Sequence, residues 1–146
     1  PHVKLGLSIC SELWVPELQR ILALRGAEMI FAPVHGLHSD TLFDPNKVKD
    51  TWRSIARARA AENTCYVIVT QNAYKRIDTD FKNISGALVA SPEEIVGLRE
   101  EPGVLVTEID MDRLDYLRTR NYDEENLSRH PETDRKRGIL HYILTW

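Results

Sequence analysis

The chain has 146 residues, 42% of them hydrophobic and 28% charged, and a formal net charge of -3 at pH 7. These values are typical of one globular domain and exclude a disordered or fibrous protein, while the slightly acidic balance argues against nucleic acid or an anionic membrane as the main partner. No apolar run approaches the roughly 20 residues of a membrane span and no signal-like leader opens the chain, so we expect a cytoplasmic protein with no membrane partner.

The first predicted element is a strand over residues 2–10, where apolar side chains alternate with smaller or polar ones up to Cys10. A helix from Pro16 to Arg25 follows, because proline suits a first helical turn and Gly26 ends the pattern. A structural cysteine belongs among apolar neighbours, whereas a nucleophile belongs at a strand end that opens into a cleft. The position of Cys10 therefore suggests chemistry. Because the chain begins without methionine and enters a strand almost at once, we expect it to be a piece of a longer protein.

Residues 27–33 form the next predicted strand. The order strand, helix, strand predicts a parallel β-α-β unit and an α/β layered fold. Residues 33–46 contain Pro, Gly, Asp and Asn without a sustained period, which predicts a long loop at a strand end, where α/β proteins place functional sites. A helix over residues 48–63 and a buried strand over residues 65–71 follow.

The last third of the chain has shorter predicted elements. Residues 84–91 and 104–110 are predicted strands, joined through residues 92–103, whose Pro and Gly indicate antiparallel, hairpin-like links. A short helix is predicted over residues 111–120. The polar tail then ends in the apolar residues 139–146, which we expect to dock on this domain or on a partner.

Five ordered segments resemble the nitrilase, or carbon-nitrogen hydrolase, superfamily. They are GLSICSELWVPELQR (6–20), RGAEMIFAP (25–33), WRSIARARAAENTCYVIVTQN (52–72), ISGALVASPEEIV (84–96) and GVLVTEIDMDRL (103–114). The resemblance implies an α/β fold that is part of an α-β-β-α sandwich, with residues 1–146 as a single domain, the C-terminal portion of a carbon-nitrogen hydrolase domain. Because members pair through outer helices and C-terminal extensions, it also implies a homo-oligomer.

The resemblance implies hydrolysis of non-peptide carbon-nitrogen bonds in small amides, nitriles or carbamoyl compounds, through a cysteine thioester and without a cofactor or metal. It assigns the nucleophile to Cys10 and an oxyanion-binding backbone N–H to Ser11. The family's general-base Glu and its Lys lie N-terminal to the cysteine, and only nine residues precede Cys10. Neither role is assigned here, so we expect the missing N-terminal half of the domain to be a partner and the chain alone to be inactive.

Four further residues are candidates for the site, each with a plain alternative. Glu12 is either a surface turn residue or a group that supports the thiol, and Trp14 is either a packing residue or part of the pocket wall. Glu17 is either a charge at a helix N-terminus or a buried partner of an arginine, Arg20 or Arg57. His35, in the loop, either lines the pocket, as we expect, or is only a surface residue. In contrast, Cys65 opens an apolar strand and is expected to be structural.

Two other functions stay open at this point. A non-catalytic nitrilase-like interaction module would use its unpaired sheet edges to hold a partner. An acyltransferase of the same superfamily would differ only in the molecule that takes the acyl group from the thioester. The reactivity of Cys10 separates catalysis from a scaffold role, and products formed with added amines separate transfer from hydrolysis.

Overall fold

The computed structural model describes residues 3–35, 37–39, 44–72, 81–83 and 85–120. The chain divides into two compact units, Pro1–Ile109 and Asp110–Trp146. In chain order the elements are β1 (Leu5–Leu7), the 3-10 helix η1 (Cys10–Trp14), α1 (Pro16–Leu24), β2 (Met29–Val34), β3 (Leu37–Ser39), α2 (Pro45–Asn63), β4 (Tyr66–Gln71), β5 (Phe81–Asn83), β6 (Gly86–Ala90), β7 (Ile95–Arg99) and α3 (Met111–Arg120). All of these except α3 belong to the first unit.

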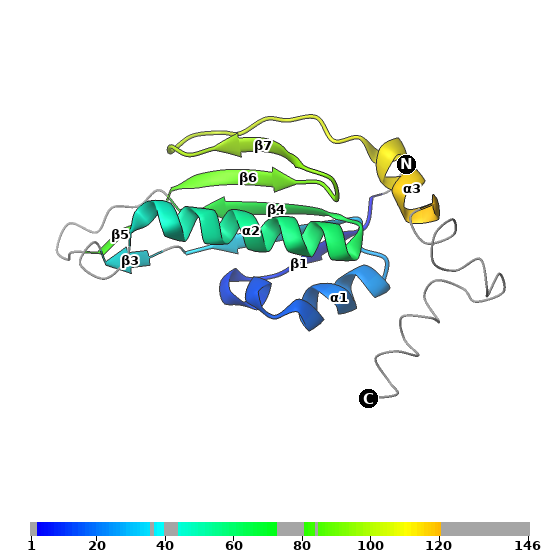
Figure 1. The fold of residues 1–146 in the computed structure, drawn as a ribbon, viewed down its shortest axis with the longest axis horizontal. Coiled ribbons are helices and arrows are strands. Elements are labelled where there is room, and N and C mark those ends of the chain that lie inside the picture. Colours follow the sequence, from blue (N-terminus) through cyan, green and yellow to red (C-terminus); the bar gives the residue numbers. More distant parts are fainter. Residues whose placement is uncertain (1–2, 36, 40–43, 73–80, 84, 121–146) are drawn as a thin grey trace. The chain divides into compact units, whose positions relative to one another are not determined.

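The first unit is built on a five-stranded sheet with the order β1-β2-β4-β6-β7 (Figure 1). β1, β2 and β4 are parallel, whereas β6 and β7 run antiparallel to their neighbours. β3 and β5 form a separate antiparallel pair. α1 joins β1 to β2, which confirms the predicted parallel β-α-β unit and the α/β class.

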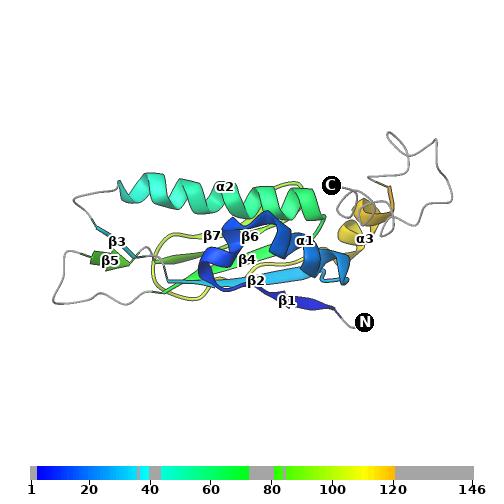
Figure 2. The same cartoon turned by 90° about the horizontal axis from the view of Figure 1, so that it is seen from below.

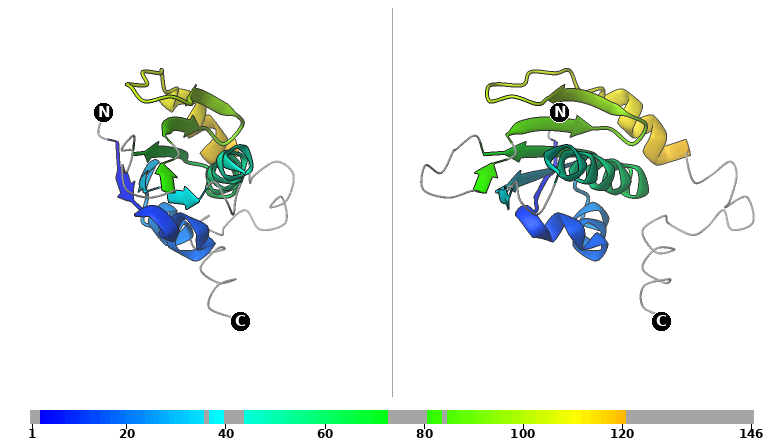
Figure 3. Two further views of the ribbon diagram at one scale, coloured as in Figure 1. Left: turned by 90° about the vertical axis from the view of Figure 1, so that its left-hand side faces the viewer. Right: turned by 60° about the vertical axis from the view of Figure 1, so that its left-hand side comes forward.

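The helices of this unit lie on one face of the sheet. Figure 2 and the left panel of Figure 3 show α1 and α2 on the same side of the strands. Every second residue along a strand points to this side, and those of β2, β4 and β6 are buried against α2 and against Leu13 of η1. The buried core comprises Leu13, Ala27, Ile30, Ala32, Val34, Trp52, Ala56, Ala60, Cys65, Val67, Val69, Leu88 and Ala90. Each large apolar side chain buried in this way contributes about 1.5–3 kcal/mol to stability. The expected structural role of Cys65 is confirmed.

The opposite face of the sheet carries apolar side chains that are exposed to solvent. Leu5, Leu7 and Phe31 are 63%, 62% and 37% exposed, and the register pairs Leu7 with Phe31 on adjacent strands. Within the described part of this unit, no helix lies on that face (Figure 2). The apolar side of the predicted first strand therefore faces away from the core, while Gly6 packs under α1 through Leu22.

The helix ends follow local signals in the sequence. α1 begins at Pro16 as predicted and ends one residue before the predicted boundary at Arg25, and Gly26 follows with φ 97°. α2 begins at Pro45, three residues before the predicted start, because Asp44 caps it by accepting the N–H of Asn46 at 2.9 Å. α3 has its predicted bounds. None of the helices among the described residues combines the length and the apolar character that a membrane crossing requires.

The predicted strand over residues 104–110 is wrong, and β7 (Ile95–Arg99) forms instead inside the predicted link. A tight turn after β6 explains the difference. The N–H of Ser91 donates to the carbonyl of Glu94 at 2.7 Å, and the Ser91 hydroxyl accepts the N–H groups of Glu93 and Glu94. This turn reverses the chain at once, so the next apolar residues pair with β6.

Candidate active site

Cys10 occupies the first position of η1, immediately after the chain leaves β1. β1 ends at Leu7, and the N–H of Ser8 still donates to the carbonyl of Phe31 at 2.9 Å. Cys10 then adopts φ 52°, in the left-handed region that a residue with a Cβ rarely enters. Such a conformation costs about 1–3 kcal/mol and is concentrated at functional positions, including the strand-to-helix turns that expose nucleophiles. The free thiol is partly exposed and partly packed against the core.

Glu12 closes the turn around this cysteine. One of its carboxylate oxygens accepts the backbone N–H of Ile9 at 2.6 Å, and the N–H of Glu12 donates to the carbonyl of Ile9 at 3.1 Å. Glu12 is therefore a turn residue, and its carboxylate holds the N–H of Ile9, directly before Cys10. A charge-assisted bond of this kind is about twice as strong as a neutral one.

Gln19 supports the same turn from α1, and the sequence analysis missed it. It is 0% exposed, and its Nε2 donates to the Ser8 hydroxyl at 2.7 Å and to the carbonyl of Glu12 at 3.2 Å. Because a carbonyl only accepts, this second bond fixes the orientation of the amide, and the Oε1 atom has no partner within the described part of the chain. The sequence does carry a signal for it, because Gln19 is a polar residue three positions before Leu22, on the buried side of an amphipathic helix.

Arg59 reaches the other end of η1 from α2 and was also missed. Its Nε donates to the carbonyl of Leu13 at 3.0 Å and its Nη2 to the carbonyl of Trp14 at 3.1 Å. Its Nη1 donates to the Glu62 carboxylate at 3.1 Å. Residues 57–63 are part of a motif that carried the family resemblance, but sequence separation hid the contact with the cysteine turn.

Ser11, the expected oxyanion donor, and His35 lie near the same edge of the sheet as Cys10. Ser11 follows Cys10 in the first turn of η1, and its amide N–H meets no acceptor within the described part of the chain. His35 directly follows β2 and is exposed. Because β1 and β2 are parallel, Cys10 and His35 both lie beyond the carboxyl edge of the sheet.

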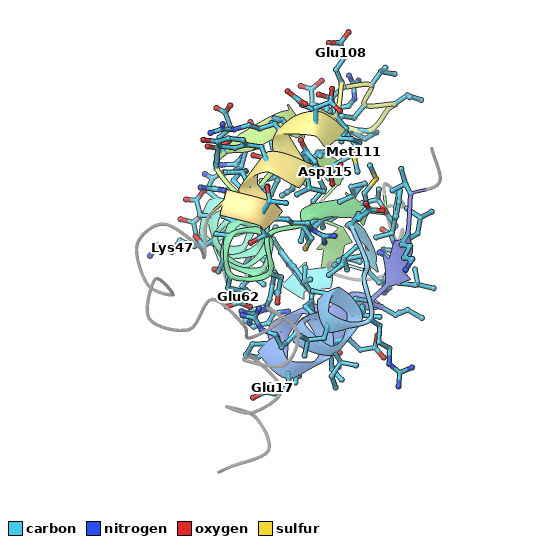
Figure 4. The ribbon with its side chains drawn as sticks, turned by 90° about the vertical axis from the view of Figure 1, so that its right-hand side faces the viewer. Glu17, Lys47, Glu62, Glu108, Met111 and Asp115 are labelled. Carbon is cyan, nitrogen blue, oxygen red and sulfur yellow. The ribbon has the colours of Figure 1, made fainter. Side chains whose placement is uncertain are left out.

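Trp14 and Glu17 are both exposed. Trp14 is 48% exposed and makes an edge-to-face contact with Trp52 at 5.3 Å between ring centroids, so it packs on α2 and keeps a free face. Glu17 points outward from the first turn of α1 (Figure 4). Among the described residues it pairs with neither Arg20 nor Arg57, and the guanidinium of Arg57 binds the carbonyls of Ser91 and Glu93 instead. The alternative of a buried pair at Glu17 is therefore wrong.

A shallow pocket of about 300 Å³, open to solvent, lies beside Trp52 and is lined by other residues than those predicted for the site. It is lined by Lys49, Trp52, Arg53, Val69, Gln71, Ser85, Gly86, Ala87, Leu88, Leu98, Arg99 and Glu100. Arg53 pairs with Asp50 and Glu100 at its edge. None of the residues predicted for the site lines this pocket, so it gives no support for a substrate cavity at Cys10.

A model of the carbon-nitrogen hydrolase family matches residues 1–119. The chain belongs to this family. It is 36% identical over 119 residues to the deaminated glutathione amidase of Synechocystis sp., and the matched region covers 78% of this chain and 40% of that protein. The match to the family occupies the N-terminal part of the chain and stops before residues 120–146, so it does not confirm that the whole chain is the C-terminal portion of the domain.

Solved structures of carbon-nitrogen hydrolases have the same fold. The enzyme from Helicobacter pylori G27 superposes with a TM-score of 0.74 at 23% identity, covering 87% of this chain and 47% of that one. An amidase mutant from Nesterenkonia sp. AN1, which carries the result of Michael addition of acrylamide at its active site cysteine, has a TM-score of 0.59 at 25% identity and covers 79% of this chain and 42% of that one. The chain thus spans less than half the length of these relatives.

Proposed function

We propose that Cys10 is the nucleophile of an amidase-type carbon-nitrogen hydrolase that acts on small amides, nitriles or carbamoyl compounds. The left-handed conformation of Cys10 is the observation that carries this proposal, because strained backbone at a partly exposed cysteine in a strand-to-helix turn is concentrated at functional positions. Membership of the family and the amidase relative support the same chemistry.

For an amide, the reaction begins when the Cys10 thiolate attacks the carbonyl carbon. The carbonyl electron pair moves to oxygen, and the N–H of Ser11 donates a hydrogen bond to this oxyanion. The carbon-nitrogen bond then breaks, the nitrogen takes a proton and leaves as ammonia or an amine, and the acyl group stays on sulfur as a thioester. Water attacks the thioester, releases the carboxylic acid and regenerates the thiol.

The proposed reaction also needs a general base and a second group that binds the oxyanion. The family's general-base Glu and its Lys are unassigned here, and the Glu12 carboxylate is engaged with the N–H of Ile9. We propose that the rest of the domain supplies both groups and covers the exposed apolar face that carries Leu5, Leu7 and Phe31. Pairing with a second copy and a cytoplasmic location stay predictions, and the apolar residues 139–146 lie outside the described residues.

The test is to follow the acyl group on the natural protein. A panel of short aliphatic amides is mixed with the wild-type protein and with its Cys10→Ala and Cys65→Ala variants, and intact mass is measured after rapid acid quenching. We expect an acyl adduct on Cys10 in the wild type and in Cys65→Ala, with free acid as the product. Full activity of Cys10→Ala contradicts the proposal, and an N-substituted amide formed as the main product in the presence of an added amine assigns acyl transfer instead.

A further inference from the structure

Arg59 satisfies the two carbonyl groups that η1 leaves without a helical partner. Within η1, the carbonyl of Ile9 accepts the N–H of Glu12, and the carbonyl of Glu12 accepts the N–H of Val15. The carbonyls of the last helical residues have no further helical N–H to accept. The guanidinium fork of Arg59 meets those of Leu13 and Trp14, at 3.0 and 3.1 Å.

The guanidinium of Arg59 is itself held in place. Its third nitrogen donates to the Glu62 carboxylate at 3.1 Å, and the Arg59 side chain is only 12% exposed. Glu62 lies three residues further along α2 and is labelled beside that helix in Figure 4. The neighbouring Asn63 donates from its amide to the carbonyl of Arg59 at 2.9 Å. All three guanidinium nitrogens are therefore engaged, which fixes the plane of the fork.

The two ends of η1 are anchored by different parts of the chain. Near its start, Glu12 binds the N–H of Ile9 and Gln19 binds Ser8, all within residues 8–19. At its end, Arg59 reaches across from a helix 45 residues further along the sequence than Trp14. Because η1 is a short hydrogen-bonded unit, anchoring its last carbonyls fixes its rotation and hence the direction of the Cys10 side chain and of the Ser11 N–H.

We propose that Arg59, held by Glu62, is a positioning residue that aligns the Cys10 thiol with the oxyanion-binding N–H of Ser11. This inference rests on the proposed role of Cys10 as a nucleophile. Lysine at position 59 keeps the charge but has one ammonium group, so it cannot bind two adjacent carbonyls and a carboxylate in one plane. The Arg59→Lys substitution therefore changes the packing little, but it removes the simultaneous bonds to the two carbonyls and the carboxylate.

Two reagents separate alignment from mere stability. Iodoacetamide alkylates a thiolate without forming an oxyanion, whereas 4-nitrophenyl acetate acylates it through a tetrahedral oxyanion that needs the Ser11 N–H. In the natural protein, we expect Arg59→Lys to slow acylation of Cys10 by about tenfold or more and alkylation by about threefold or less, because small misplacements act on the transition state. Glu62→Gln, which loses the ion pair but keeps an acceptor, is expected to slow acylation by about threefold. Rates are followed by 4-nitrophenolate release and by intact mass.

Arg57→Lys is the matched control. Arg57 lies on the same helix and also donates to two backbone carbonyls, those of Ser91 and Glu93, at the turn between β6 and β7. We expect this variant to change both rates by less than about twofold. Equal slowing of the two reactions in Arg59→Lys, or acylation as fast as in Arg57→Lys, overturns the inference. Amidase activity retained by Cys10→Ala overturns the proposed function instead. In that case the rates of acylation and alkylation of Cys10 in Arg59→Lys and Arg57→Lys still test the alignment.

Discussion

The backbone N–H of Ile9 donates to the carboxylate of Glu12 over 2.6 Å, and this bond spans the left-handed residue Cys10. It closes a loop of four residues in which the strained residue has little freedom to relax. The strain at Cys10 is thus held by a side chain only two positions away, before any substrate binds.

Glu12→Ala removes this closing bond. We expect the variant to lower the free energy of unfolding by about 1–2 kcal/mol, similar to the loss of a helix N-cap, because the N–H of Ile9 loses its charged acceptor. Urea unfolding followed by circular dichroism measures the change. Glu17→Ala is the matched control, since Glu17 is an exposed acidic residue nearby, and it is expected to change stability by less than about 0.5 kcal/mol. Equal effects of the two substitutions would contradict the role of Glu12.

Glycine at position 10 tests the strain itself. Because Cys10 has φ 52°, we expect Cys10→Gly to be more stable than Cys10→Ala by about 1 kcal/mol, since only glycine adopts this region without a steric cost. Ala58→Gly, at an exposed position of α2, is the control, because glycine there is expected to lower the free energy of unfolding by about 1 kcal/mol relative to alanine. Urea unfolding of the three variants is the measurement. A Cys10→Gly protein less stable than Cys10→Ala would rule out a strained turn.

Gln19 and Ser8 form a buried pair whose coupling can be measured. We expect Gln19→Ala to cost about 2–3 kcal/mol, because it opens a cavity and leaves the Ser8 hydroxyl without its amide donor. Ser8→Ala is expected to cost about 1 kcal/mol, and the double variant to cost less than the sum by about 1 kcal/mol. Thermal and urea unfolding give the three values. Strict additivity would show that the 2.7 Å bond contributes nothing to stability.

Leu7 tests whether the exposed face of the sheet is covered in the natural protein. If the rest of the domain packs there, Leu7→Asp buries a carboxylate against apolar groups, and we expect a loss of at least about 2 kcal/mol. Ala58→Asp, on the outer side of α2, is the control and is expected to cost less than about 1 kcal/mol. A natural protein that tolerates Leu7→Asp as well as Ala58→Asp would show that this face stays open to water.

The chain of residues 1–146 by itself is expected to lack amidase activity. It contains the proposed nucleophile, but the base and the lysine of the family are not assigned to any of its residues. The assay measures ammonia released from short aliphatic amides by purified chain of this length, with the natural protein as the positive control. Hydrolysis by the chain alone would place a complete catalytic set within these residues. The intact mass of the natural protein shows directly whether the chain is a fragment of it.

Local signals explain which parts of the fold were predictable. Pro16 and Gly26 bracket α1, and short, mainly apolar runs place β2 and β4, because these features act over a few neighbouring residues. The hairpin of β6 and β7 was misplaced, since the sequence analysis took all of residues 92–103 as the link, whereas the chain reverses directly after Ser91 and β7 forms inside that link. The backbone and the hydroxyl of Ser91, followed by Pro92, close the turn at the start of that link.

The site was predictable only in part for a similar reason. Cys10 and Ser11 are marked by their place at the end of an apolar segment and by the family motif around them. Gln19 and Arg59 are not, because they bind backbone carbonyls, which every residue carries, and the carbonyls that Arg59 binds lie 46 and 45 positions away. The exposed side of β1 was likewise hidden, because alternation predicts two unlike faces without telling which one is covered.

Two arginines of α2 link its position to two turns at once. Arg57 and Arg59 are two residues apart, so their side chains leave the helix about 200° apart around its axis, one toward the turn after β6 and the other toward η1. Both turns are completed by contacts between residues far apart in sequence, 34 to 46 positions from the arginines that make them. The position of a single helix therefore constrains the turn that carries the cysteine and the turn at the antiparallel end of the sheet together.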